Sequence, residues 1–114
     1  MRALPSLALL AALALAACTP RVIVRPADGG RTTFAWTGHA DAAWLSGTMT
    51  GWRRVPLERR GGGFAVEMKV PPGRHEYRLE VEIAGEIRIV LPEGAERVDD
   101  GYGGDNGVLR AGGR

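Results

Sequence analysis

Trp52 is the residue of this 114-residue chain whose surroundings most clearly indicate a chemistry. It stands in a stretch that we expect to be a loop, next to Gly51 and followed by Arg53 and Arg54. An exposed flat aromatic ring can stack on the C–H face of a sugar, while polar side chains hydrogen-bond the hydroxyls at its rim. The loop tryptophan therefore indicates carbohydrate binding. The alternative is a ring that packs over the edge of the domain.

Residues for catalysis or metal binding do not form a recognisable set in the sequence. Ser46 is the only serine after residue 17, and no nucleophile motif surrounds it. His39 and His75 are expected to be solvated, beside a turn and at the start of a strand. The acidic, glycine-rich segment 99–107 lacks the ligand spacing of a calcium loop. We therefore expect a protein that is not an enzyme and that uses neither a metal nor a cofactor.

The first 17 residues have the pattern of a secretory signal peptide. A positive start is followed by an almost unbroken Leu/Ala run, which is shorter than the ~20 residues of a membrane-spanning helix. The tetrad Leu15–Cys18 resembles the lipobox of bacterial lipoproteins. That resemblance implies that Cys18 is acylated and holds the protein on a membrane, and Thr19 after it implies the outer membrane, facing the periplasm. The alternative is an ordinary signal peptide with a coincidental cysteine.

Composition predicts one small all-β domain after this leader. Cleavage before Cys18 leaves 97 residues, which contain all 17 glycines and most of the seven prolines. That glycine content excludes a helical bundle and favours short strands with tight turns. The net charge is +2 with both signs interspersed, so no nucleic-acid partner is expected. We expect a lipidated cysteine and flexible tether over 18–31, the domain over 32–111 and a tail over 112–114.

Two stretches of alternating residues are the clearest strands. Residues 64–70 alternate apolar and polar side chains, and residues 76–83 do so again, which is the period of a half-buried strand. In the second stretch, Tyr77, Leu79, Val81 and Ile83 are expected to face the core. Six to eight short antiparallel strands at this spacing predict an immunoglobulin-like β-sandwich. Val22–Val24 could add a first strand.

Several motifs resemble the glycogen-binding domain of AMP-activated protein kinase beta subunits. That domain belongs to family 48 of the carbohydrate-binding modules, with an early-set immunoglobulin-like fold. The resemblance covers residues 32–111 and rests on motifs that occur in the family's order: Thr33–Gly38, Trp44–Trp52, Val55–Leu57, Val70–Leu79 and Asp100–Leu109.

The resemblance also implies site residues. Trp52 matches the loop tryptophan that stacks on glucose, Arg78 matches a basic residue that contacts hydroxyls, and Asn106 matches an asparagine that hydrogen-bonds glucose. Tyr102 replaces a leucine that pushes into the oligosaccharide ring, and Gly104 replaces a contacting threonine. Ile87 stands where the family carries a second stacking tryptophan.

Two functions remain open because half of the aromatic platform is missing. The first is a weak or altered binder of an α-glucan or other polysaccharide, in which Tyr102 and the outward Trp44 supply new surfaces. The second is a sandwich that has lost sugar binding and serves as a protein-interaction or structural lipoprotein of the envelope. Trp36 alternates within an early strand and is expected in the core.

Overall fold

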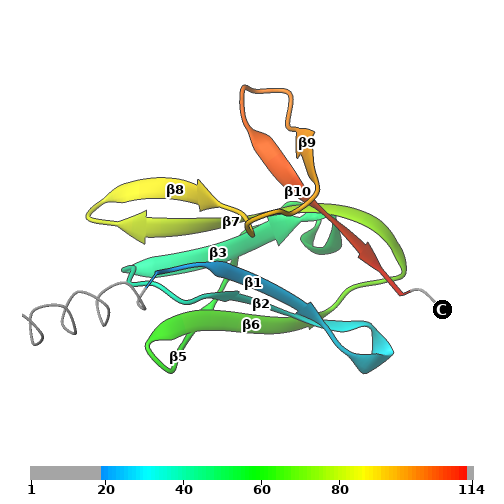
Figure 1. Ribbon diagram of the computed structural model, residues 1–114, viewed down its shortest axis with the longest axis horizontal. Coiled ribbons are helices and arrows are strands. Elements are labelled where there is room, and N and C mark those ends of the chain that lie inside the picture. The colour runs from blue at the N-terminus through cyan, green and yellow to red at the C-terminus, as the bar shows by residue number, and fades with distance from the viewer. Residues whose placement is uncertain (1–18, 113–114) are drawn as a thin grey trace, which may run out of the picture.

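The computed structural model describes residues 19–112, which form ten strands in two antiparallel sheets (Figure 1). The first sheet has the order β1-β2-β6-β5, and its strands span Val22–Pro26, Arg31–Trp36, Gly63–Lys69 and Glu58–Arg60. The second has the order β4-β3-β7-β10-β9, with strands Val55–Pro56, Ala42–Gly47, Gly73–Ile83, Asp105–Ala111 and Arg97–Asp99. Strand β8 (Glu86–Val90) pairs with β7 beside this path. The predicted signal peptide, Cys18 and the last two residues lie outside the described range.

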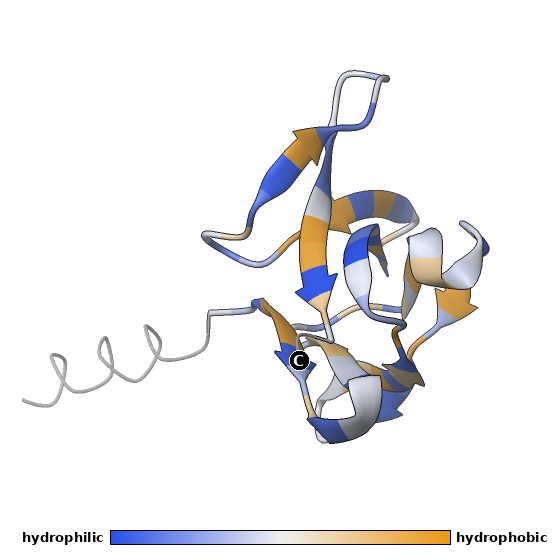
Figure 2. Cartoon of the chain, turned by 90° about the vertical axis from the view of Figure 1, so that its right-hand side faces the viewer, coloured by the Kyte–Doolittle hydropathy of each residue, from blue (hydrophilic) through white to orange (hydrophobic). Residues whose placement is uncertain are grey.

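The core lies between the two sheets and includes most of the predicted alternating residues. Hydrophilic and hydrophobic residues alternate along the strands, as expected for sheets with one buried face (Figure 2). Tyr77, Leu79 and Val81 are buried on β7, and Ile83 packs partly buried against them. The Tyr77 ring meets Phe34 of the facing sheet edge to face, with centroids 5.7 Å apart. The prediction of an all-β sandwich is confirmed.

The expected tether is wrong from Val22 onward. Strand β1 pairs with β2 over its whole length, from Val22 opposite Trp36 to Pro26 opposite Thr32. Val22 is buried, so this segment belongs to the domain and contributes to its core. A 3₁₀ turn at Asp28–Gly30 (η1) then leads into β2. In the described part of the chain, no helix is long and apolar enough to cross a bilayer.

The chain leaves β3 through a tight turn. Strand β3 ends at Gly47, where the chain turns into a 3₁₀ helix at Thr48–Thr50 (η2). Only glycine fits at this position, because a Cβ on Gly47 would lie 2.5 Å from the carbonyl oxygen of Glu76. The short strands β4, β5 and β9 complete the two sheets.

Candidate functional site

Trp52 stands on a loop that the backbone holds in an unusual conformation. Its φ is +64°, a left-handed value that costs a non-glycine residue about 1–3 kcal/mol. The Trp52 N–H donates to the Gly47 carbonyl at 2.9 Å, and the Gly47 N–H donates to Thr50 Oγ1 at 3.1 Å. These bonds fix the loop, and the Trp52 ring remains 44% exposed. Strain that presents an aromatic ring to solvent points to function rather than to packing.

The η2 turn before this loop is also tied to the start of β7. His75 Nδ1 lies 2.8 Å from the Thr48 hydroxyl, and His75 Nε2 lies 2.8 Å from the Pro71 carbonyl oxygen. The imidazole therefore bridges η2 and the β6–β7 turn, a contact beyond the simple solvation expected for this histidine.

Arg78 and Asn106 are neighbours on the outer face of the second sheet. Alternation along β7 buries Tyr77 and Leu79, so Arg78 points outward between them. Ser46 of β3 pairs with Arg78 on one side. On the other side, Gly107 of β10 pairs with Tyr77, so the next residue in the ladder, Asn106, is adjacent to Arg78. Ser46, Arg78 and Asn106 thus form one row across three strands, close to the end of β3 from which the Trp52 loop departs.

Asn106 is more buried than a residue that binds sugar at an exposed surface would be. Its side chain is only 6% exposed, and its amide donates to Glu76 Oε1 at 3.3 Å. Its Oδ1 is buried and accepts no hydrogen bond from the described residues. A buried acceptor without a partner is costly, which marks this position as unsatisfied in the free protein.

Asp100 organises the loop that carries Tyr102. Its Oδ1 accepts the backbone N–H groups of Tyr102 at 2.7 Å and Gly104 at 3.1 Å, and its Oδ2 lies 4.0 Å from an Arg78 nitrogen. These N–H groups, with a smaller effect of Arg78, lower the pKa of the Asp100 carboxyl below its usual value. Tyr102 itself is 95% exposed at the tip of the β9–β10 hairpin. The sequence interpretation missed Asp100, although its Asp-Gly dipeptide is a turn signal.

Trp44 lies on the same outer face, as its alternation predicted. It pairs with Glu80 of β7 and with Pro56 of β4. The guanidinium of Arg54 lies 4.0 Å from the centre of the Trp44 ring, a cation–π contact, and Arg54 Nε donates to Glu80 Oε1 at 2.8 Å. Arg54 therefore covers this tryptophan, which the sequence alone did not indicate.

Residue 87, where the resemblance implies a second stacking tryptophan, also lies on the outer face. Ile87 and Ile89 of β8 pair with Glu82 and Glu80 of β7, so all four side chains share the outer face. Ile87 is 50% exposed. An aromatic ring at residue 87 would therefore stand on the predicted binding face.

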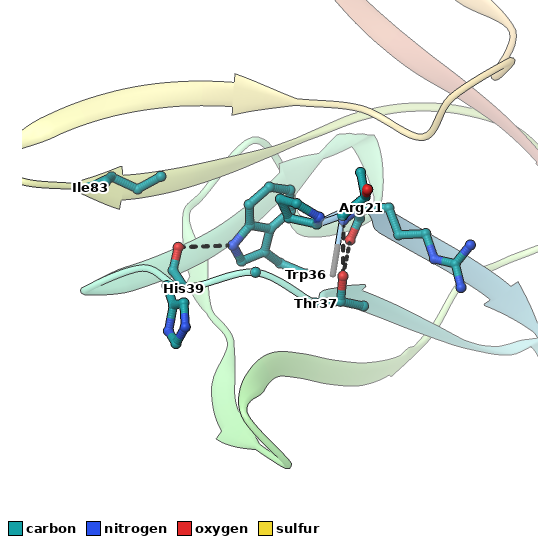
Figure 3. Close-up of a pocket in the computed structure, with 8 residues that line it drawn as sticks. Arg21, Trp36, Thr37, His39 and Ile83 are labelled. Carbon is teal, nitrogen blue, oxygen red and sulfur yellow. Dashed lines mark hydrogen bonds between the residues drawn. The ribbon is translucent and has the colours of Figure 1, made fainter. Parts of the chain in front are cut away.

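A cavity of about 690 Å³ lies elsewhere, at the end of the sandwich where β1 begins (Figure 3). Its lining is Thr19, Pro20, Arg21, Trp36, Thr37, Gly38, His39 and Ile83. The indole N–H of Trp36 donates to the His39 carbonyl at 3.4 Å, and Trp36 is buried, which confirms its expected place in the core. None of the predicted sugar-binding residues lines this cavity. The predicted site thus lies away from this cavity, on the outer face of the second sheet.

Within residues 19–112, no cluster of three or more histidine, cysteine or acidic side chains could hold a metal ion.

Comparison with known proteins agrees with this fold. A family model described as the glycogen recognition site of AMP-activated protein kinase matches residues 30–108. The chain therefore belongs to this family of non-catalytic carbohydrate-binding modules.

Individual relatives match the chain over part of its length. The chain is 35% identical to 5'-AMP-activated protein kinase subunit beta-1 of Rattus norvegicus and of Homo sapiens over 57 residues, half of this chain and 21% of each relative. It is 26% identical over 82 residues to SNF1 protein kinase subunit beta-3 of Saccharomyces cerevisiae, which is 68% of this chain and 18% of that protein. The chain thus spans about a fifth of the length of these relatives.

Proposed function

We propose that the outer face of the second sheet binds an α-glucan. In this proposal Trp52 stacks on one glucose ring, and Arg78 and Asn106 supply polar contacts beside it. Tyr102 contributes a further surface from the tip of the β9–β10 hairpin. The observation that carries the proposal is the Trp52 loop, in which a hydrogen bond from the Trp52 N–H to the Gly47 carbonyl holds a strained and half-exposed tryptophan near the end of β3.

Aromatic stacking sets the expected strength of binding. Stacking on one aromatic side chain contributes about 1–3 kcal/mol for nucleic-acid bases, and a sugar ring should gain no more. With Ile87 in place of a second ring, the affinity should be about ten- to a hundredfold weaker than with two platforms. The proposal is therefore a binder of modest affinity.

Isothermal titration of the full chain, purified in detergent, with maltoheptaose tests this function. Wild type should give saturable heat, Trp52→Ala should give none, and Trp52→Phe should keep part of the affinity because it keeps a flat ring. The melting temperature of each variant controls for loss of fold. Unchanged heat for a folded Trp52→Ala variant would place the site elsewhere.

We further propose that an acylated Cys18 displays this module on a membrane. Only Thr19–Arg21 separate Cys18 from β1, a span of at most ~11 Å. Strand β1 begins near Ile83, whereas the Trp52 loop departs near Tyr77, about 20 Å away along β7 (Figure 1). An anchored domain would therefore carry the Trp52 loop at the end away from the lipid.

Mass spectrometry and fractionation test the anchor separately from sugar binding. The mature protein should carry acyl chains on Cys18, and Cys18→Ser should leave an unprocessed precursor or release the protein from the membrane. An unmodified thiol on the mature protein would contradict the anchor without affecting the sugar site.

A protein-interaction role is the second candidate, and one observation favours it. Ile87 and Ile89 are each about half exposed side by side on β8, and exposed apolar pairs of this kind suit a protein interface. Absence of heat with maltoheptaose for wild type and for Ile87→Trp would favour this role over glucan binding.

A further inference from the structure

We infer that Trp44 is a second stacking platform of the proposed glucan site and that Arg54 covers it when no sugar is bound. The inference rests on the proposed function and extends it to a longer ligand. It assigns a subsite for an additional hexose ring beyond the one on Trp52.

The position of Trp44 suits an extended chain that crosses Arg78. Ser46 pairs with Arg78 and Trp44 pairs with Glu80, so Trp44 is the diagonal neighbour of Arg78 on the outer face. Such diagonal neighbours lie about 7–8 Å apart, within reach of an aromatic side chain. A glucan that stacks on Trp52 and contacts Arg78 would meet Trp44 next.

The contact with Arg54 covers the ring but is exposed enough to be displaced. The guanidinium lies 4.0 Å from the ring centre, and its ion pair with Glu80 measures 2.8 Å. Half of the Arg54 side chain is nevertheless exposed. The exposed guanidinium can move into water, and Glu80, whose side chain is only 14% exposed, keeps a charged partner in Arg78 at 3.7 Å. The apolar face of a sugar can therefore replace the guanidinium on the ring.

Glu80 links the displacement of Arg54 to Arg78. Its Oε2 lies 3.7 Å from Arg78 Nε, which is buried and donates no hydrogen bond to a described residue. When Arg54 leaves, the Glu80 carboxylate is free to turn toward Arg78 and give this nitrogen a partner. Release of Arg54 thus satisfies a buried donor at the centre of the site, which favours the open arrangement once a sugar occupies Trp44.

Titration with ligands of two lengths tests the inference. Maltotriose and maltoheptaose are titrated into wild type, Arg54→Ala, Trp44→Leu and the double variant. Arg54→Ala should bind maltoheptaose about three- to tenfold more tightly with little change for maltotriose. Trp44→Leu should lose about tenfold for maltoheptaose alone. The double variant should behave like Trp44→Leu, because the gain from Arg54→Ala depends on the ring.

The controls separate this inference from the proposed function. Arg88→Ala removes an exposed arginine of β8 that, among the described residues, forms an ion pair with Glu86 alone at 3.8 Å, and it should leave both affinities unchanged. Weaker or equal maltoheptaose binding by Arg54→Ala, or an equal loss for both ligands in a folded Trp44→Leu variant, would overturn the second platform while the Trp52 site stands. If wild type and Arg54→Ala bind neither ligand, the proposed function itself fails and the second platform fails with it.

Discussion

The side-chain amide of Asn106 on β10 donates a hydrogen bond to Glu76 of β7 at 3.3 Å. This contact crosses the two strands on the outer face, next to Arg78. It keeps a nearly buried amide and a partly exposed carboxylate together at the rim of the proposed site. The Asn106 amide therefore orients Glu76.

Removal of either polar rim residue should weaken glucan binding without abolishing it. Asn106→Ala and Arg78→Ala should each lower the affinity for maltoheptaose about ten-fold, because water partly replaces the lost hydrogen bonds. Isothermal titration measures the loss, and melting temperatures check the fold. Affinities equal to wild type for both variants would show that Arg78 and Asn106 do not belong to the binding site.

The buried face of β7 should dominate stability. Leu79 is fully buried in the core, so Leu79→Ala should lower the free energy of unfolding by about 2–5 kcal/mol. That is a large part of the ~5–15 kcal/mol available to a small domain. Chemical denaturation of wild type and variant gives the value, with the exposed Ile89→Ala as the matched control. A loss below 1 kcal/mol would contradict the assigned core.

Ile87→Trp should strengthen binding. The register of β8 places residue 87 on the outer face, opposite Glu82, where its side chain is half exposed. A new ring there would add a platform at the position where the family carries one, and the affinity for maltoheptaose should rise about tenfold or more. Ile87→Leu is the control for added apolar bulk. An Ile87→Trp variant that binds no better than Ile87→Leu would show that sugar does not reach β8.

Alkaline pH should destabilise the fold through Tyr77. Burial raises the pKa of the Tyr77 hydroxyl to about 12 from an ordinary value of 10.0. Between these values the unfolded chain loses this proton and the folded chain keeps it, so stability is intact below pH 10 and falls as the pH rises toward 12. The slope from this group should approach 1.4 kcal/mol per pH unit. Denaturation curves at several pH values should show this slope in wild type, and Tyr77→Phe should lack it.

Period-two alternation predicted the core strands because a sheet with one buried face imposes that period on the sequence. It predicted Tyr77, Leu79 and Val81 as core residues, and they are buried. The sequence predicted β1 less clearly, because Pro20, Pro26 and two glycines surround Val22–Val24 and are typical of a linker.

The contacts around the candidate site were harder to predict from the sequence. Arg54 reaches Glu80 across 26 positions of the chain, and charges of both signs also occur on other strands, such as β5 and β8. No local pattern distinguishes a guanidinium that covers Trp44 from one that is solvated. Trp52 was predictable as a loop residue from its neighbour Gly51. Its positive φ depends on a backbone hydrogen bond to Gly47, which no sequence pattern indicates.

Nuclear magnetic resonance mapping of a maltoheptaose titration tests the central claim most directly. The three tryptophan indole N–H signals report on three places at once: the proposed site at Trp52, the second platform at Trp44, and the unrelated cavity at Trp36. We predict saturable shifts for Trp52 and for the side-chain amide of Asn106, with Trp36 unchanged. Shifts confined to Trp36 and the residues around it, or no shift at all at millimolar sugar, would contradict a glucan site on this face.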